Sequence, residues 1–360
     1  MIGGRKIECA KDIASFTAWK TANYTSTANW ANNPAWVFFD YLTNEVFGLG
    51  REIIVDKDGN DKLDTTQKET LYRDIWNWSV WCAHEVGGND IIDCNAIIFG
   101  AESKIEVLQK IAALGHAKFV YLNGNPRLIF DGNSYDNAGG TPVVKKLVNQ
   151  TNAGNLMYSS GSIDNLINVY NVKFANKDNF YRLEEVQYKN TASIALFGER
   201  EKNIDLWGCS VKQQAVWHAA WLYETEVVNS ETVTYIAGWD HFDVLPGDLI
   251  CVSDSLRADG LNTGGRVSAI GSGTITLDRT ASGSIAVMDT SGVVRLGTAS
   301  GTTVTISGTF QKHAVWNIYT GADAQNYRVI AIEESEDGIY AVTAQKFDPA
   351  KYSRVWANTI

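Results

Sequence analysis

Residues 327–347, YRVIAIEESEDGIYAVTAQKF, predict the β-hairpin around which the rest of the chain is organised. Two runs rich in strand-forming residues flank an acidic turn, where Asp337-Gly338 supplies a residue that readily adopts positive φ. Strict alternation puts apolar side chains on both faces of the first strand, with Tyr327, Val329 and Ala331 on one and Ile330 and Ile332 on the other. We therefore expect both faces to be covered, as in a closed barrel or an interface. A buried pair of sandwich strands is the alternative that the pattern leaves open.

A resemblance to a known family begins in this hairpin. The stretch RVIAIEESEDGIYAVTAQKFDPAKY (328–352) resembles the end of the hub region in the family of tail tip attachment protein J of lambda-like siphophages. There, two strands around an acidic turn with glycine precede a Lys-Tyr motif. NNPAWVFFDYLTNEVFGLG (32–50) and residues 94–131 and 198–254 resemble further parts of the same family. The resemblance spans about residues 3–355 and implies a structural protein of the virion rather than an enzyme.

The N-terminal stretch IGGRKIECAKD (2–12) resembles a strand that, in this family, follows a substantial earlier part of the hub. Because Met1 lies almost on this motif, the resemblance predicts that the earlier part is missing or encoded elsewhere. Residues 1–30 would then carry unpaired strand edges and few partners of their own. We expect such an edge to dock against another tail protein.

Composition bounds the classes of function. A chain of 360 residues with 45% apolar and 20% charged residues is typical of an ordered protein of two or three domains. Twelve Trp, 15 Tyr and 13 Phe indicate extensive packing, with a carbohydrate platform as the alternative. The net charge of −10 and the lack of a basic run argue against direct phosphate binding, and such a protein would let DNA pass without adhering.

The cysteines and the N-terminus indicate where the protein is made. Five cysteines are widely spaced and form no CxxC motif: Cys9, Cys82, Cys94, Cys209 and Cys251. This pattern favours reduced, buried thiols in a protein assembled in the cytosol. The N-terminus lacks the apolar core of a signal peptide, and no apolar run approaches the length of a membrane span. We therefore expect neither an export signal nor a membrane anchor.

The N-terminal half of the chain predicts helices and a hairpin. The start signals are Asn33-Pro34, a Thr66–Glu69 capping box and a Ser103–Glu106 box, and the helices are expected to end near His84 and at Gly115. Asn123-Gly124 turns one short strand back onto another. Together these elements predict a compact α+β lobe.

The fold class expected for the whole chain is α+β and multidomain, with a helical α+β lobe followed by a mainly β, barrel-type hub domain that carries an all-β insertion. Asn- and Gly-rich residues from Gly132 to Asn155 mark a boundary. The expected domains are an N-terminal arm with a partial hub strand at 1–30, the α+β lobe at 31–140, the hub domain at 155–263 with 321–355, and the insertion lobe at 264–320. The hairpin at 327–347 should pair with strands near 231–252.

Motifs that carry chemistry are absent from the sequence. It contains no nucleophile elbow, no phosphate-binding loop and no dinucleotide-binding turn. The histidines at 116, 218, 241 and 313 lie in different segments without metal-ligand spacing, and His241 with Asp243 is too little for a catalytic pair. We therefore predict no catalytic residue, no cofactor and no metal ligand. A pair of carboxylates at glycosidase spacing is left open.

Residues 56–64, DKDGNDKLD, imitate a calcium-binding loop. The sixth position holds Asp61 where the motif has Gly, and the twelfth holds Gln67 where it has a bidentate Glu. A solvated acidic loop is the better prediction. We therefore expect Asp56→Ala combined with Asp58→Ala to leave stability unchanged.

The resemblance implies a tail hub or tail tip protein, the baseplate hub of a long-tailed phage. Three copies would form a homotrimeric ring that continues the tail tube, supports host attachment and lets DNA pass through its lumen without specific binding. The implied partners are the distal tail, tube, tape measure and fibre proteins, with indirect contact to the host outer surface. The implied location is the virion tail tip, after assembly in the host cytoplasm. The alternative is a virion-associated carbohydrate-binding or carbohydrate-degrading protein.

Overall fold

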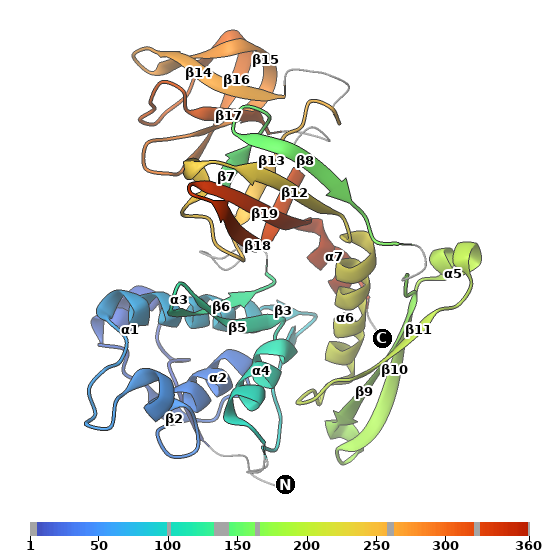
Figure 1. Ribbon diagram of the computed structural model, residues 1–360. Helices are drawn as coiled ribbons and strands as arrows, with labels where there is room; N and C mark the ends of the chain where they lie inside the picture. The colour runs from blue at the N-terminus through green and yellow to red at the C-terminus, as the bar shows by residue number, and fades with distance from the viewer. Residues whose placement is uncertain are drawn as a thin grey trace. The chain divides into compact units, whose positions relative to one another are not determined.

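The computed structural model describes residues 6–98, 102–132, 144–162, 166–257, 263–319 and 325–358 (Figure 1). The first residues of the expected N-terminal strand (1–5) and much of the expected boundary (133–143) lie outside the described residues. The chain is a mixture of helix and strand, as predicted.

Contacts divide the chain into two compact units. The first unit comprises Met1–Thr141, Ile167–Tyr223 and Lys351–Ile360, and the second comprises Pro142–Leu166 and Glu224–Ala350. This division differs from the expected one, because residues 167–223 were assigned to the hub domain and belong to the first unit. Whether each of the four expected segments folds on its own as a domain remains a prediction.

The N-terminal part of the first unit combines helices with short hairpins. The helices are α1 (Phe16–Thr21), α2 (Pro34–Thr43), α3 (Thr65–Cys82) and α4 (Lys104–Leu114), with a π-helical turn η1 (Gly50–Ile54). The hairpins are β1 (Ile7–Cys9) with β2 (Thr27–Asn29), β3 (Glu85–Val86) with β4 (Asn89–Asp90), and β5 (Ala117–Leu122) with β6 (Asn125–Phe130). The predicted turn of the last hairpin is confirmed, with Asn123 and Gly124 both at positive φ.

The caps of the helices agree with the sequence in part. Asn33 caps α2 and Gly115 ends α4, as predicted. Ser103 occupies the N-cap of α4, but its side chain makes no capping hydrogen bond, so the predicted box does not form.

The predicted capping box of α3 is wrong by two residues. Asp64, not Thr66, is the N-cap, and its carboxylate accepts hydrogen bonds from the backbone N–H groups of Thr66 and Gln67. The side chain of Gln67 accepts from the N–H of Asp64 in return (3.0 Å). Asp is preferred at least as strongly as Thr at an N-cap. Starting the helix at Asp64 gives the first backbone N–H groups a carboxylate acceptor.

Residues 6–30 pack on their own chain, so the expectation that the N-terminal arm has few partners is wrong for them. The ring of Trp19 is fully buried. It stacks on Tyr72 of α3 (5.5 Å between centroids, 16°) and meets Phe39 of α2 edge-on (5.3 Å). Aromatic side chains bury large areas, so this segment belongs to the core of the first unit.

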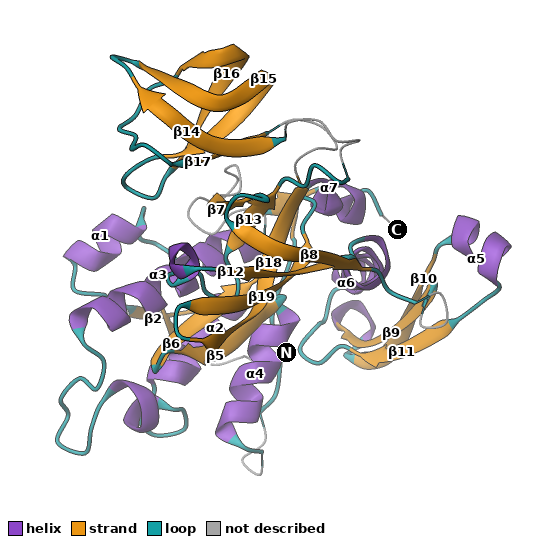
Figure 2. Cartoon of the chain, turned by 45° about the horizontal axis from the view of Figure 1, so that its top comes forward, coloured by secondary structure: helices purple, strands orange, loops and turns teal. Residues whose placement is uncertain are grey.

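A three-stranded sheet completes the first unit (Figure 2). Its order is β10-β9-β11, with β9 at Val169–Asn176, β10 at Arg182–Lys189 and β11 at Glu201–Asp205. The associated helices are η3 (Lys177–Asn179), α5 (Thr191–Phe197), α6 (Lys212–Tyr223) and the C-terminal α7 (Ala350–Trp356). Helix α6 packs against β9 and β10, and β9 buries Val172 and Phe174.

The second unit is built on a six-stranded sheet that forms a half-barrel. Its order is β7-β13-β18-β19-β12-β8, with β7 at Val144–Val148, β8 at Ala153–Ser159, β12 at Thr232–Ala237, β13 at Leu249–Val252, β18 at Gln325–Glu336 and β19 at Ile339–Lys346. The predicted hairpin is β18 and β19, turning at Asp337-Gly338. Its expected pairing is confirmed, because β19 pairs with β12 and β18 with β13. Short helical turns η4 (Glu224–Val228) and η5 (Trp239–His241) flank β12.

A β-bulge in β18 explains why both faces of the strand look apolar in the sequence. The register shifts between Val329 and Ala331, so that Ile330 is the extra residue and is 50% exposed. Beyond the bulge, Ile332 packs on the same core as Tyr327 and Val329. Alternation therefore misassigned Ile332, because one inserted residue inverts the phase of a strand. The outer face stays uncovered at Ile330 within the chain.

The expected all-β insertion forms a second sheet in this unit. Its strands are β14 (Gly264–Ile270), β15 (Thr274–Met288), β16 (Val294–Thr305) and β17 (Val315–Ile318), in the order β14-β17-β15-β16. Two buried asparagines join it to the six-stranded sheet. Asn149 Nδ2 donates to Asn317 Oδ1 (2.9 Å), and Asn317 Nδ2 donates to the carbonyls of Val148 (3.1 Å) and Cys251 (3.0 Å). Because these buried polar groups satisfy one another, they fix one arrangement of the two sheets.

Candidate functional site

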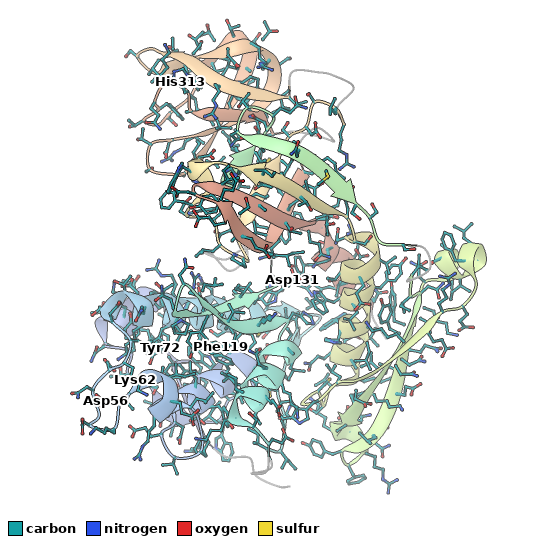
Figure 3. All side chains as sticks on the ribbon, viewed as in Figure 1. Asp56, Lys62, Tyr72, Phe119, Asp131 and His313 are labelled. Carbon is teal, nitrogen blue, oxygen red and sulfur yellow. The ribbon has the colours of Figure 1, made fainter. Side chains whose placement is uncertain are left out.

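A buried cluster in the first unit fixes helix α7 to the rest of that unit. Asp131, labelled in Figure 3, follows β6. Donors from two distant segments converge on its carboxylate. Lys351 Nζ lies 2.5 Å from Oδ2, the Tyr352 hydroxyl donates to Oδ1 at 2.7 Å, and Trp221 Nε1 donates to Oδ2 at 2.8 Å. Lys351 is buried, so its charge depends on this carboxylate for compensation.

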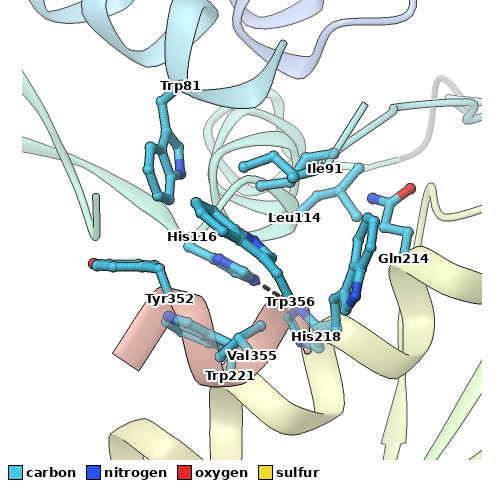
Figure 4. Close-up of a pocket in the computed structure, with 12 residues that line it drawn as sticks. Trp81, Ile91, Leu114, His116, Gln214, His218, Trp221, Tyr352, Val355 and Trp356 are labelled. Atoms are coloured by element: carbon cyan, nitrogen blue, oxygen red, sulfur yellow. Dashed lines mark hydrogen bonds between the residues drawn. The ribbon is translucent and has the colours of Figure 1, made fainter. Parts of the chain in front are cut away.

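Two neutral histidines pack beside this carboxylate. His116 Nε2 and His218 Nδ1 are 3.0 Å apart, and Trp221 stacks on His116 at 3.8 Å between centroids (Figure 4). Burial lowers the pKa of His218 to about 4. Burial and the neighbouring His218 lower the pKa of His116 well below its ordinary value. At neutral pH one uncharged ring therefore donates to the other.

The cavity between these side chains is small. Its volume is about 20 Å³, and its walls include Trp81, Leu114, Gln214, Trp217 and Trp356 (Figure 4). Such a space holds about one water molecule and excludes a substrate. The ring centroids of Trp81 and Tyr352 are 4.9 Å apart, so a residue of the cavity wall also packs against α7. The arrangement is built to anchor a helix.

Sequence reasoning missed this cluster, although both halves lie in stretches that carry the family resemblance. Asp131 ends the stretch 94–131, and Lys351 and Tyr352 are the Lys-Tyr motif after the hairpin. The two halves are 220 residues apart, so no local periodicity connects them. Both halves lie in stretches that resemble the J family, and this shared resemblance was the signal that could have pointed to the cluster.

The loop that imitates a calcium site uses its first carboxylate internally. Asp56 Oδ1 accepts from the backbone N–H groups of Asp58 (2.8 Å) and Asn60 (2.9 Å). Hydrogen bonds from the backbone and side chain of Asn60 hold the pKa of Asp56 below its usual value. In the described part of the chain, no group of three His, Cys, Asp or Glu residues is placed to hold a metal ion. The effect of the two Asp→Ala substitutions stays a prediction.

The structure does not bring His241 and Asp243 together. His241 is buried and its Nδ1 lies 3.0 Å from Asp240, while Asp243 pairs with Lys145 and Lys146. The prediction of buried thiols is confirmed, because the five cysteines are all buried and unbridged.

The tryptophans mostly serve packing. Six of the twelve are buried: Trp19, Trp36, Trp78, Trp81, Trp217 and Trp316. Two are largely exposed, Trp30 (53%) and Trp239 (64%), and they belong to different units. Packing thus accounts for much of the aromatic content that suggested a carbohydrate platform. No helix among the described residues combines the length and apolarity needed to cross a membrane.

Comparison with known proteins finds similarity to phage tail proteins. The Phage-tail_3 family, described as "Putative phage tail protein", matches residues 145–270. Tip attachment protein J of Escherichia phage SECphi27 is 24% identical over 91% of this chain, and that of Escherichia phage SECphi4 is 22% identical over 66%. The expected resemblance to tip attachment protein J is confirmed. The J-like chain spans 28% and 20% of the length of these two relatives.

Solved structures resemble the J-like chain at low similarity. One is the virion of a native gene transfer agent particle, with a TM-score of 0.42, 9% identity, and coverage of 78% of this chain and 48% of that one. Another is the 43 kDa tail protein of prophage MuSo2 from Shewanella oneidensis, with a TM-score of 0.32, 13% identity, and coverage of 70% and 56%. Similarity at this level carries no argument about function.

Proposed function

We propose that the J-like chain is a structural subunit of the hub at the tail tip of a long-tailed phage. The observation that carries this proposal is the alignment with a tip attachment protein over 91% of the chain. Three copies form a ring that continues the tail tube and acts as the baseplate hub for host attachment. The chain performs no catalysis of its own in this role.

The outer face of the six-stranded sheet supports assembly into a ring. On this face Thr234 pairs with Thr343, and Ile236 pairs with Ala341, between the neighbouring strands β12 and β19. These four side chains are uncharged and only partly covered by their own chain. Beside these positions the same face carries Arg328 and Glu333, which pair with Gln345 and Ala341. A partly covered sheet surface that mixes neutral and charged side chains suits an interface between subunits.

The proposed partners follow from this position. Distal tail, tube, tape measure and fibre proteins meet the ring, and contact with the host outer surface is indirect. A net charge of −10 repels the phosphates of DNA, so DNA passes through the lumen without specific binding. The ring assembles in the host cytoplasm and resides in the virion.

Cryo-electron microscopy of the particle, with mass measurement of isolated tail tips, tests the proposal. We expect three copies around the tail axis, with interfaces on the order of 2,000 Å² per contact, the size of a permanent assembly. One copy or six copies per tip would contradict the ring of three. A map in which another protein fills the hub density would overturn the proposed function itself.

A further inference from the structure

Lys351 and Asp131 form an ion pair that is largely closed off from solvent. Their side chains are 5% and 17% exposed, and Lys351 Nζ lies 2.5 Å from Asp131 Oδ2. The ammonium also lies over two aromatic rings, 5.0 Å from the centroid of Tyr352 and 5.9 Å from that of Trp221. The free energy needed to take two charges out of water can exceed the attraction between them. A reaction that removes both charges is therefore favoured at this site.

The side-chain nitrogen of Lys351 lies close to the carboxyl carbon of Asp131. A carboxyl C–O bond is about 1.23 Å long, so a nitrogen 2.5 Å from Oδ2 lies no more than about 3.7 Å from Cγ. Groups held at about 3–3.5 Å in a fixed orientation react far faster than the same groups free in solution. The fold brings this pair together from positions 220 residues apart. The pair is thus held near the geometry in which an amine attacks a carboxyl carbon.

Two donors polarise the carboxyl group of Asp131. The Tyr352 hydroxyl donates to Oδ1 at 2.7 Å, and Trp221 Nε1 donates to Oδ2 at 2.8 Å. Attack on Cγ moves negative charge onto these oxygens, and donors already aimed at them stabilise that charge. Trp221 stacks on His116, and Tyr352 packs edge-on against Trp81 (Figure 4). Both donors are therefore held in place before any reaction.

We propose that Lys351 and Asp131 join through an intramolecular amide bond, an isopeptide cross-link. A proton passes from the ammonium to Oδ2 within the ion pair, which leaves a neutral amine and a neutral carboxylic acid. The amine nitrogen attacks Cγ, the C–N bond forms and the C–Oδ2 bond breaks. Oδ2 leaves as water with two of the three ammonium protons, and the third proton stays on the amide nitrogen. The reaction needs no further reactant and does not depend on the proposed role in the tail tip.

The amide bond makes the attachment of α7 permanent. Asp131 directly follows β6, and Lys351 lies in the first turn of α7. The bond closes a long loop of chain between them, so α7 stays tethered to the end of β6 even after the surrounding packing is lost. A cross-link that closes a long loop also restricts the unfolded chain, which favours the folded one.

The mass of the denatured chain tests the bond directly. The full chain is unfolded in guanidinium with a reducing agent, and its intact mass is measured by mass spectrometry. We expect a mass below that of the sequence by one water molecule. Trypsin cuts after free Lys and Arg, so we also expect a branched peptide in which residues 128–145 are joined to residues 347–354. In this peptide the chain remains uncut after Lys351.

Lys351→Arg separates the amide bond from the ion pair. Arginine keeps the positive charge, but its guanidinium does not lose its proton in proteins and so does not act as the amine. We expect this variant to fold and to have the full mass of its sequence. Lys189 and Glu199 are the matched control within the chain, because their ion pair is as close (2.6 Å) but 40% and 44% exposed. Water solvates both of these charges, so we expect both residues to stay unmodified.

Tyr352→Phe tests the donor to Oδ1. The variant removes the hydroxyl and keeps the ring, so the packing against Trp81 is retained. Loss of one donor to the developing negative charge should slow formation of the bond about a hundred-fold. The linked fraction is measured by mass at intervals after a short pulse of synthesis. Tyr121→Phe, at an exposed position of β5, should form the bond at the parent rate.

The outcomes separate the cross-link from other changes of the same mass. A parent chain with its full sequence mass, and with trypsin cutting after Lys351, overturns the inference. Loss of water without the branched peptide also overturns it, because Asp131-Gly132 loses the same mass when it closes a succinimide ring. A Lys351→Arg chain that still loses water assigns the loss to another site. Equal rates in Tyr352→Phe and the parent overturn the role given to that hydroxyl.

Discussion

Asp131 is the residue that ties the C-terminal helix to the first unit, and its environment makes it sensitive to change. Its carboxylate satisfies a buried ammonium, a hydroxyl and an indole at once. Removing one partner of a buried ion pair leaves the other charge uncompensated, which costs more than the pair itself contributes. The neighbouring histidines add a second sensitivity, because they must stay uncharged to remain buried.

We predict that Asp131→Ala lowers the free energy of unfolding by about 3–5 kcal/mol, measured by urea denaturation. The cause is the stranded charge of Lys351 rather than lost packing. The double variant with Lys351→Met removes both charges and should cost less than the single one. A single variant within about 1 kcal/mol of the parent would show that solvent reaches Lys351 and that the cluster does not anchor α7.

The pKa of His218 predicts how stability depends on pH. The unfolded histidine titrates near its ordinary value, while the folded one titrates at about 4. Between these values the unfolded state binds more protons, so stability is full above about pH 6.5 and falls as the pH drops towards 4. The loss from His218 amounts to about 3 kcal/mol. His218→Gln should flatten this slope, and His313→Gln, on an exposed residue, should not; equal slopes in both variants would contradict the assignment.

At the scale of elements, the bulge in β18 decides which side chains enter the core. Val329 is buried, whereas its neighbour Ile330 is the inserted residue and faces outward. Alternation alone would treat Ile330 and Ile332 alike, but only Ile332 packs on the core of the half-barrel. Bulges of this kind re-aim side chains and increase local twist, which helps a sheet to curve.

We predict that Val329→Ala costs about 2–3 kcal/mol of unfolding free energy in the isolated subunit, because it leaves a cavity in the core. Ile330→Thr keeps a β-branched side chain at the bulge and should stay within about 0.5 kcal/mol. Thermal and urea unfolding of the two variants measure the difference. Equal costs would mean that the register assigned to β18 is wrong.

At the scale of the whole molecule, each unit is assembled from separate stretches of chain. The first unit takes three stretches and the second takes two. After the hairpin of the second unit, the chain returns to the first unit as α7. Because α7 comes last in the chain, a truncation can remove it from the first unit without deleting any strand of the second unit.

We predict that ending the chain at Pro349 destabilises the first unit selectively. It removes Tyr352 and Val355 from the core, at a cost on the order of 5 kcal/mol together with the lost ion pair. Amide hydrogen exchange should speed up in α3 and α6 and stay unchanged in β12 and β19. Ending the chain at Asn358 is the control and should have little effect, because it keeps α7 and the hydrogen bond from Gln213 Nε2 to the carbonyl of Asn358 (2.7 Å). Faster exchange in β12 and β19 as well would indicate one cooperative unit.

The sequence by itself determined the local elements and the resemblance. Asn33 at a helix start, Gly115 at a helix end and Asp337-Gly338 at a hairpin turn act through their own backbone, so their signals survive without any knowledge of the fold. Sequence motifs such as those at 32–50 and 328–352 carried the J-like resemblance, and the expected pairing of the hairpin with residues near 231–252 is confirmed.

Only the tertiary structure decided which distant residues meet. The partners Asp131 and Lys351 are far apart along the chain, and the phase of Ile332 depends on a bulge defined by the pairing of β18 with β19. The N-terminal segment was expected to need another protein, but the ring of Trp19 finds its partners in α2 and α3. Burial and long-range pairing depend on residues that are distant along the chain. Local sequence patterns therefore do not predict them.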